Sequence, residues 1–266
     1  MKAAVNSVTL RSSAPEEVVE TLLAHGISAV EWVGNEHVPP GDLKRARSVR
    51  ELCESSGLIC ASYGSYYPCD EEAGGSGQFS WNRGADPVLE TARTLGVSSI
   101  RVWAGRQASA LASIEYRDEV RRCLSSFCDK AADFGMTVHL EFHRNTLADT
   151  ADSTVELIEE LGRRNLYSYW QPRHGVDLAG NLEDISILGD RISNVHVFHW
   201  LLQEDGFSVD RRPLSEGRER WAAYIQKLRT LAGDRYAMLE FVLGDCLEQF
   251  SEDTSVLKGL LEGSEG

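Results

Sequence analysis

The sequence lacks long apolar runs and paired cysteines. No stretch approaches the ~20 consecutive apolar residues that a membrane-spanning helix requires, and residues 1–8 lack the apolar core of a secretory signal. The six cysteines show none of the short spacings that zinc ribbons or redox pairs use; they are Cys53, Cys60, Cys69, Cys123, Cys128 and Cys246. We therefore expect reduced thiols in a cytoplasmic protein that does not enter a membrane.

The sequence also has fewer basic than acidic residues. The 266 residues include 41 acidic and 27 basic side chains, which gives a formal net charge of -14. A surface of this sign repels phosphate backbones, so nucleic acid is not an expected partner. The hydrophobic share of 42% and the charged share of 26% are ordinary for a globular protein. The length suits one α/β barrel domain over residues 1–266.

Short apolar segments alternate with amphipathic segments along the whole chain. The expected strands are residues 5–10, 27–33, 58–62, 98–103, 137–141, 166–170, 192–198 and 236–242. The expected helices lie near residues 14–25, 42–57, 86–96, 116–134, 153–161, 182–188, 221–231 and 247–261, with long loops at 63–83 and 201–217. Eight such units repeat about every 33 residues, which predicts a closed (β/α)8 TIM barrel.

An open, doubly wound sheet is the alternative architecture for this alternation. Sheets of that kind that bind dinucleotides carry a glycine-rich loop directly after the first strand. Thr9–Ser12 stands at that place in this chain. The closed barrel is therefore the preferred fold.

One segment, Thr137–Thr146, joins an apolar strand directly to a cluster of polar side chains. Gly135 ends the preceding helix pattern, and the strand then runs to Glu141. Because the carboxyl ends of parallel strands carry the ligands of α/β folds, a carboxylate at this position indicates a functional site. An ion pair between Glu141 and Arg144 at the barrel rim is the alternative interpretation.

Side chains of ligand type also lie at the ends of the three later strands. Gln171 ends the sixth expected strand, His196 lies near the end of the seventh, and Glu240 lies near the end of the eighth. In a closed barrel they converge with Glu141 on one mouth. Two carboxylates, an imidazole and an amide oxygen suit one divalent metal ion, Mn, Co, Mg or Zn, because the two negative charges balance the cation.

Four further histidines lie in or just after the same strands. His174 follows the sixth strand and His199 follows the seventh, so they are expected to form a second layer of imidazoles around the first. His143 is expected at the rim, where it contacts the substrate. His139 lies in the middle of its strand, and we interpret it as a hydrogen-bonded core histidine.

Five short motifs, taken in order, resemble one family. They are Ala29-Val-Glu-Trp, Leu140-Glu-Phe-His-Arg-Asn, Trp170-Gln-Pro-Arg-His, Asn194-Val-His-Val-Phe-His and Met238-Leu-Glu-Phe. The set is similar to the xylose isomerase-like TIM barrels, in particular to the sugar phosphate isomerase/epimerase branch. The resemblance implies that the metal is bound by Glu141, Gln171, His196 and Glu240. The family usually has Asp where this chain has Gln171, so the affinity and identity of the metal stay open.

The resemblance also implies some of the substrate contacts. His174 matches a histidine of the family, and Arg211 matches an arginine that follows the seventh strand, although Arg212 matches almost as well. Glu31, near the end of the second strand, can bind substrate hydroxyls, although a rim ion pair is an equal alternative. The expected substrate contacts are His174, Arg211, His199, His143, Glu31 and Trp103.

These side chains permit proton transfer next to a carbonyl group. A metal that binds a ketose carbonyl and a neighbouring hydroxyl acidifies the C–H bond between them and stabilises the enediolate. One carboxylate can take the proton and another can return it, and the resemblance assigns these roles to Glu141 and Glu240. We therefore expect a metal-dependent isomerase or epimerase of a sugar or sugar derivative, with a homodimer as one expected assembly.

Three other functions stay open at this point. A lyase of the inosose or dehydroshikimate dehydratase type would expel a leaving group from the same enolate. A non-enzymatic sugar-binding protein would result if Gln171 marks a decayed site. The apurinic endonucleases of the family need further histidines on the third and fourth strands, where this chain has Ser62-Tyr-Gly-Ser and Val102-Trp-Ala-Gly. The missing histidines and the acidic charge argue against nuclease activity.

Overall fold

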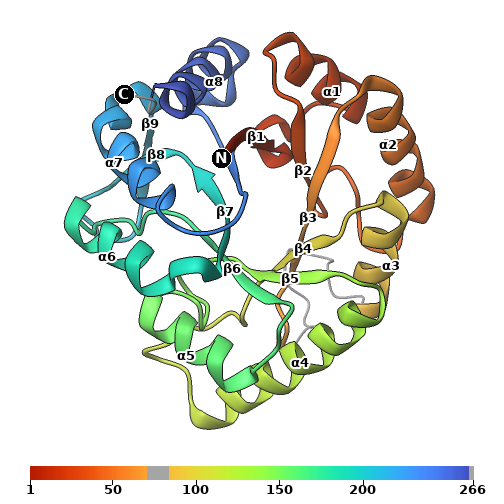
Figure 1. Ribbon diagram of the computed structural model, residues 1–266, viewed down its shortest axis with the longest axis vertical. Helices are drawn as coiled ribbons and strands as arrows, with labels where there is room; N and C mark the ends of the chain where they lie inside the picture. Colours follow the sequence, from red (N-terminus) through yellow and green to blue (C-terminus); the bar gives the residue numbers. More distant parts are fainter. Residues whose placement is uncertain (71–83, 264–266) are drawn as a thin grey trace.

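The computed structural model describes residues 1–70 and 84–263, which form a closed barrel of parallel strands (Figure 1). The strand order around the barrel is β1-β10-β7-β6-β5-β4-β3-β2. The strands are β1 (Lys2–Asn6), β2 (Ala29–Val33), β3 (Ile59–Tyr67), β4 (Ser99–Val102), β5 (Thr137–Leu140), β6 (Leu166–Trp170), β7 (Ile192–Val197) and β10 (Tyr236–Leu239). All neighbouring pairs are parallel, so the predicted (β/α)8 barrel is confirmed.

Helices cover the outside of the barrel (Figure 1). They are α1 (Pro15–Ala24), α2 (Leu43–Ser56), α3 (Ala85–Leu95), α4 (Ile114–Asp133), α5 (Ala151–Leu161), α6 (Leu178–Leu188), α7 (Arg218–Leu228) and α8 (Leu247–Glu262). Their ends follow ordinary capping chemistry: Asp42 and Ser113 accept hydrogen bonds from backbone N–H groups at the start of α2 and α4. The main apolar core lies between strands and helices and includes the fully buried Trp32, Trp170 and Trp221.

The first strand ends earlier than the sequence pattern predicts. A strand was expected over residues 5–10, but β1 ends at Asn6, and Ser7–Leu10 form a 3-10 turn. The Asn6 side chain accepts a hydrogen bond from the Val8 backbone N–H at 3.1 Å and so caps this turn. The hydroxyl of Thr9 then donates to the Leu239 carbonyl at 3.2 Å. Side-chain capping therefore overrides the apolar pattern of the segment.

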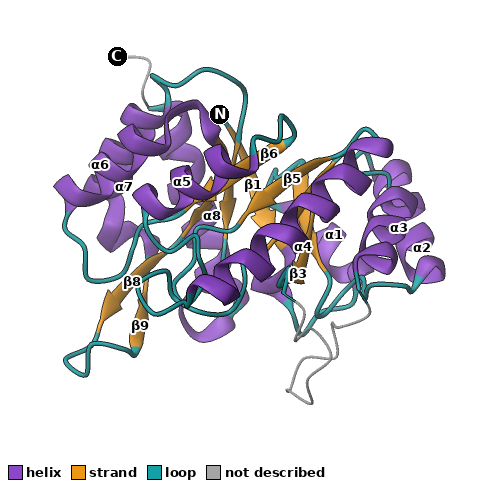
Figure 2. Cartoon of the chain, turned by 90° about the horizontal axis from the view of Figure 1, so that it is seen from below, coloured by secondary structure: helices purple, strands orange, loops and turns teal. Residues whose placement is uncertain are grey.

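The two predicted long loops contain regular structure. At the loop predicted for residues 201–217, β8 (His199–Leu202), which begins before it, and β9 (Val209–Arg212) form an antiparallel hairpin that projects from the barrel (Figure 2). Its turn forms because Asp205 accepts hydrogen bonds from two backbone N–H groups and Gly206 adopts a φ of 69°. For the other loop, predicted over residues 63–83, the predicted start is wrong, because β3 continues to Tyr67 with an irregular register against β4. Residues 71–83 of that loop lie outside the described part of the chain.

A small apolar layer fills the barrel below the candidate site. This layer is separate from the main core and consists of Ala4, Ala29, Tyr169 and Met238. Side chains two residues apart on a strand face the same side, so the next inward positions of these strands are Asn6, Glu31, Gln171 and Glu240. The barrel thus places a polar layer directly above a closed apolar floor. In the described ranges, no helix has both the length and the apolar character needed to cross a membrane.

Gly105, in the loop after β4, is tightly packed, and Gly57, at the end of α2, provides an uncrowded comparison. Gly57 and Gly105 both have a left-handed φ, 70° and 74°, but a Cβ on Gly57 meets no atom within 4 Å. A Cβ on Gly105 would lie 2.6 Å from the Tyr116 hydroxyl. We expect Gly57→Ala to lower the free energy of unfolding by about 1 kcal/mol and Gly105→Ala by roughly 2–4 kcal/mol. Urea unfolding measures both, and equal losses would contradict the crowding at Gly105.

Candidate active site

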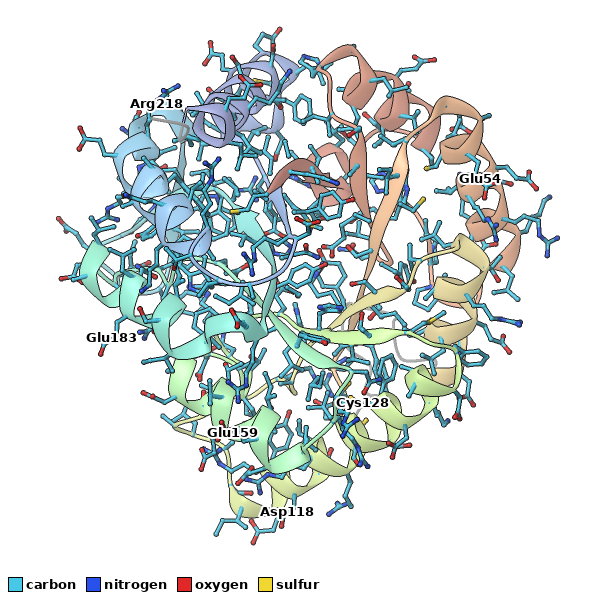
Figure 3. All side chains as sticks on the ribbon, viewed as in Figure 1. Glu54, Asp118, Cys128, Glu159, Glu183 and Arg218 are labelled. Atoms are coloured by element: carbon cyan, nitrogen blue, oxygen red, sulfur yellow. The ribbon has the colours of Figure 1, made fainter. Side chains whose placement is uncertain are left out.

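The four predicted metal ligands lie together at the carboxyl ends of their strands. One ligand atom from each of Glu141, His196 and Glu240 lies within 4.8 Å of the other two, and all three residues are buried. The amide oxygen of Gln171 lies 3.1 Å from Nδ1 of His196. Figure 3 shows side chains filling the barrel interior, whereas the labelled acids Glu54 and Glu183 lie on the outer helices. These two acids are thus separate from the buried group.

Glu31 and Arg101 form a second, deeper part of the site. Both side chains are fully buried. Nε of Arg101 donates to Oε1 of Glu31 at 3.0 Å, and its Nη1 donates to Oε2 of Glu141. The guanidinium fits because Gly64 on β3 has no side chain: a Cβ there would lie 2.5 Å from Nη2 of Arg101. The ion pair proposed from the sequence between Glu141 and Arg144 is wrong, since Arg144 donates to the Phe207 carbonyl at 2.6 Å.

In each of the two candidate carboxylate ligands, one oxygen accepts hydrogen bonds from the protein and the other faces Nδ1 of His196. Oε2 of Glu141 accepts from Arg101 and from the Trp103 indole at 2.5 Å, while Oε1 lies 3.9 Å from Nδ1 of His196. Oε1 of Glu240 accepts from the Asn6 amide at 2.9 Å, while Oε2 lies 3.4 Å from the same Nδ1. The uncommitted oxygens and Nδ1 of His196 therefore face one another.

With all three carboxylates ionised and His196 neutral, the charges of this group do not balance within the protein. Burial raises the pKa of Glu240 to about 7, and the charges of Glu141 and Glu31 add to the effect. Burial opposes ionisation of Glu31 as well, but Arg101 and hydrogen bonds from His196 and Ser62 lower its pKa to about 2. Burial also disfavours the charged form of His196, yet the negative charge of Glu240 and Glu31 raises its pKa. Three carboxylates thus face one guanidinium, and a divalent cation would neutralise the excess.

The donor set and its charge fit one divalent metal ion. Oxygen and imidazole donors of this kind suit Mn, Co, Mg or Zn. Glu141, His196 and Glu240 would hold the ion, and the amide oxygen of Gln171 is placed to join them. Glu31 is different, because both of its oxygens already accept hydrogen bonds from the protein.

Two predicted substrate contacts, His143 and His174, lie at the mouth. They line a cleft of about 220 Å³ that also reaches Gln171. His143 stacks on Trp103 with ring centres 5.4 Å apart, and His174 stacks on Trp200 with ring centres 5.3 Å apart. Burial lowers the pKa of His174 to about 4, so this imidazole is neutral near pH 7. The cleft therefore presents flat aromatic groups beside the candidate metal ligands.

Arg211 and His199, two other predicted substrate contacts, lie in different surroundings. Arg211 on β9 lies over the Phe241 ring at 4.2 Å and donates to Asp245 at 2.8 Å. Arg11 lies 5.4 Å from the centre of the same ring and donates to Asp245 at 3.0 Å, so two guanidiniums flank the residue that follows Glu240. His199 lies against Gly217, outside the group of candidate metal ligands.

His139 is a hydrogen-bonded interior histidine, as predicted. Its Nε2 lies 2.7 Å from the Thr137 hydroxyl, and its Nδ1 lies 2.6 Å from the Ser193 hydroxyl. It also stacks on Tyr167 with ring centres 5.5 Å apart. Burial lowers its pKa to about 4. These contacts occupy both ring nitrogens.

The sequence analysis missed Arg101 and Asn6. Arg101 lies between apolar residues of an expected buried strand, and a buried arginine requires a carboxylate partner. That signal was available, but the pattern does not say which carboxylate pairs with it. Asn6 was assigned to the interior of a strand, and its role depends on the turn that it caps.

Comparisons with known proteins agree with this fold. A family model described as xylose isomerase-like TIM barrel matches residues 19–257. A curated 3-dehydroshikimate dehydratase from Bacillus anthracis is 41% identical over 160 residues, which cover 54% of this chain and 56% of that protein. The chain thus spans only about half the length of the curated relative that it matches.

Solved structures are similar over nearly the whole chain. The probable 3-DHS dehydratase AsbF, involved in petrobactin synthesis in Bacillus anthracis, has a TM-score of 0.78 and 21% identity, with 97% of this chain and 99% of that chain covered. The IOLI protein, whose structure holds a zinc atom, has a TM-score of 0.77 and 17% identity, with 99% of each chain covered. At these identities the likeness concerns the fold alone.

The first prediction for this site concerns metal content. We expect one divalent ion per chain, because the uncommitted ligand atoms face one point. Removing the ion with EDTA should lower the free energy of unfolding by about 2.7 kcal/mol relative to protein at a free metal concentration of 100 times Kd. Elemental analysis and thermal unfolding measure the two effects. Glu240→Gln should lose the ion, and Glu183→Gln on the outer surface should keep it; no ion after incubation with each metal would contradict the site.

A second prediction concerns the amide at position 171. Gln171→Asp should bind the ion more tightly than the parent, because a carboxylate adds a charged ligand. Gln171→Leu should bind it about 10-fold or more weakly, because it removes an oxygen donor. Titration calorimetry with Mn²⁺ compares the three proteins. Identical dissociation constants would show that Gln171 does not contact the ion.

Proposed function

The chain belongs to the xylose isomerase-like TIM barrel family, and on that premise we propose that it is a divalent-metal-dependent lyase that removes water from a cyclic hydroxy ketone of the 3-dehydroshikimate type. The observation that carries this proposal is the 41% identity over 160 residues with a 3-dehydroshikimate dehydratase. The sequence analysis ranked a sugar isomerase or epimerase first and this lyase second. The curated relative reverses that order.

Positive charge at the mouth supports a substrate with a carboxylate group. Arg11 and Arg211 each retain about a third of their side-chain exposure, 33% and 30%, and share the single carboxylate of Asp245. The three side chains together carry one net positive charge. Guanidinium groups bind carboxylates through paired hydrogen bonds, whereas a neutral ketose offers no charge to pair with. 3-Dehydroshikimate carries a carboxylate and therefore matches this edge.

The reaction needs a proton acceptor next to the substrate carbonyl. Glu141, Gln171, His196 and Glu240 would hold the metal, which when bound polarises the carbonyl and stabilises negative charge on its oxygen. Oε2 of Glu240 and Oε1 of Glu141 are the oxygens directed toward the ion. The carboxylate of one of these residues, which is ligand and acid/base at once, takes the proton from the carbon next to the carbonyl.

The same proton can complete the elimination. The protonated carboxyl group returns it to the hydroxyl on the following carbon, so a C–H and a C–O bond break, a C=C bond forms, and water leaves. No oxidant or reductant is required. The ring then loses a further proton from carbon and gains one on oxygen, which gives an aromatic dihydroxy acid. His143 and His174 line the cleft, and in this proposal they bind substrate hydroxyls.

An isomerase or epimerase is the second candidate. It would use the same ligands and the same first proton transfer, and the description of the family supports it. The endonuclease alternative is weaker, because that branch needs further histidines on the third and fourth strands, where this chain has Ser62-Tyr-Gly-Ser and Val102-Trp-Ala-Gly. Among the described residues, one group of His, Cys, Asp and Glu side chains has the spacing of a metal site.

With Mn²⁺ present, we expect the protein to convert 3-dehydroshikimate into a dihydroxybenzoate. The aromatic absorbance of the product gives the rate, and mass spectrometry detects the loss of one water. Glu141→Gln and Glu240→Gln should each lower kcat by about 10²-fold or more, because acid–base catalysis contributes at least that much. Metal content is measured in the same samples, since both residues are also candidate ligands.

A panel of neutral ketoses in heavy water provides the comparison. Deuterium uptake next to the ketose carbonyl, with no loss of water from 3-dehydroshikimate, would replace the lyase with the isomerase or epimerase. Sugar binding with neither exchange nor turnover would replace both enzymes with a binding protein. Glu183→Gln should turn over 3-dehydroshikimate at the parent rate.

A further inference from the structure

The side chains of Asn6, Arg101 and His196 all contact the carboxylate of Glu31. His196 is itself a candidate metal ligand, and Asn6 and Arg101 contact the candidate ligands Glu240 and Glu141. We infer that Glu31 is a positioning residue that orients His196, Glu240 and Glu141 while binding neither the ion nor the substrate. The inference deepens the proposed function and rests on its metal site. It differs from the expectation that Glu31 binds substrate hydroxyls.

Both carboxylate oxygens of Glu31 accept hydrogen bonds inside the protein. Oε1 accepts from Nδ2 of Asn6 and Nε of Arg101, both at 3.0 Å, and lies 3.3 Å from Nε2 of His196. Oε2 accepts from the Ser62 hydroxyl at 2.8 Å. A carboxylate offers about four acceptor positions, and four donors surround this one. The side chain is completely buried, both of its oxygens are engaged by protein donors, and it is not part of the candidate metal group of Glu141, His196 and Glu240.

The first connection fixes the imidazole of His196. If Nε2 carries the proton and donates it to Glu31, the lone pair of Nδ1 is left for the ion. Nδ1 is also the atom that faces Gln171, Glu240 and Glu141. A carboxylate on the far ring nitrogen is the usual way in which proteins orient a metal-binding histidine.

The second connection runs through Asn6 to Glu240. Nδ2 of Asn6 donates to Oε1 of Glu31 at 3.0 Å and to Oε1 of Glu240 at 2.9 Å. Its Oδ1 accepts from the Val8 backbone N–H, which fixes the orientation of the amide. The 3-10 turn after β1 therefore sets the position of a bridge between two carboxylates. Oε2 of Glu240 is left free toward His196.

The third connection runs through Arg101 to Glu141. The guanidinium joins the two carboxylates, using Nε for Glu31 and Nη1 for Glu141. It also packs over the Tyr66 ring at 4.4 Å and uses the space beside Gly64. A planar fork that packs on a ring and donates to two carboxylates cannot rotate freely, so it fixes which oxygen of Glu141 points to His196.

The charge of Glu31 makes this arrangement possible. Glu31 neutralises Arg101, so the carboxylates of Glu141 and Glu240 remain to balance a divalent cation. A glutamine at position 31 has nearly the same shape but no charge. Its amide nitrogen can take the place of Oε2 beside the Ser62 hydroxyl, while its neutral oxygen accepts more weakly from Asn6, Arg101 and His196 than the carboxylate does. All three connections would weaken together, although no candidate ligand has been changed.

The test compares Mn²⁺ affinity across variants of these connections by calorimetry. Glu31→Gln should weaken Mn²⁺ binding about 10- to 100-fold, the usual effect of removing a residue that orients a metal ligand. Arg101→Lys keeps the positive charge but lacks the planar guanidinium that joins Glu31 to Glu141. Asn6→Ser can still cap the turn but is too short to bridge the carboxylates. Each of these two variants should weaken binding about 10-fold, and they decide the question if Glu31→Gln does not fold.

Asp253→Asn is the matched control for the loss of a buried carboxylate. Asp253 is 2% exposed and accepts hydrogen bonds from the Leu214 N–H and the Gln249 amide on the outside of the barrel. Thermal unfolding of the metal-free protein should show a loss of stability, with the dissociation constant for Mn²⁺ unchanged. If Asp253→Asn weakened Mn²⁺ binding as much as Glu31→Gln, the effect would be general destabilisation, and the inference would be overturned.

A spectroscopic measurement follows the histidine directly. In the Zn²⁺-loaded protein, ¹⁵N NMR of His196 should show the proton on Nε2, and Glu31→Gln should change that signal. Parent-like Mn²⁺ affinity and an unchanged His196 signal in Glu31→Gln would overturn the inference alone. A parent protein that binds no ion would overturn both the inference and the metal site. Confirmed positioning with no turnover of 3-dehydroshikimate would overturn only the proposed reaction.

Discussion

Three buried carboxylates at one end of a barrel can remain charged only if positive charge lies among them. Removing charged groups from water is costly, and mutual repulsion adds to the cost. Arg101 supplies one positive charge and His196 can supply a partial one, yet the pKa of Glu240 still rises to about 7. A divalent cation would remove the remaining excess. The same electrostatic constraint thus accounts for the buried arginine and supports the proposed metal site.

The barrel geometry determines which side chains take part in this arrangement. Ala4 and Ala29 belong to the apolar floor, and Asn6 and Glu31, two residues further along the same strands, belong to the polar layer. Parallel strands bring their carboxyl ends to one mouth, so residues more than 200 positions apart, such as Asn6 and Glu240, are hydrogen-bonded. Gly64 is part of the same arrangement, because a larger residue on β3 would occupy the space of the Arg101 guanidinium.

The sequence predicted the parts of this structure that depend on local pattern. The strand and helix alternation was enough for the barrel, and strand ends were enough to group Glu141, His196 and Glu240. The partner of Arg101 could not be predicted, because the partner depends on how neighbouring strands are aligned. The end of β1 was missed because Asn6 caps a turn inside an apolar stretch. The sequence could not rank lyase against isomerase for a chemical reason: both reactions begin with the same proton transfer, and the leaving group belongs to the substrate.

The central claim is that one metal ion binds at Nδ1 of His196 while Glu31 holds Nε2 of the same ring. A crystal structure of the protein with Mn²⁺, with anomalous diffraction data at the manganese edge, tests it most directly. The account predicts a single peak about 2.0–2.4 Å from Nδ1 of His196 and from oxygens of Glu141 and Glu240, with Glu31 still hydrogen-bonded to Nε2. A peak bonded to Glu31, or no peak inside the barrel, would contradict it.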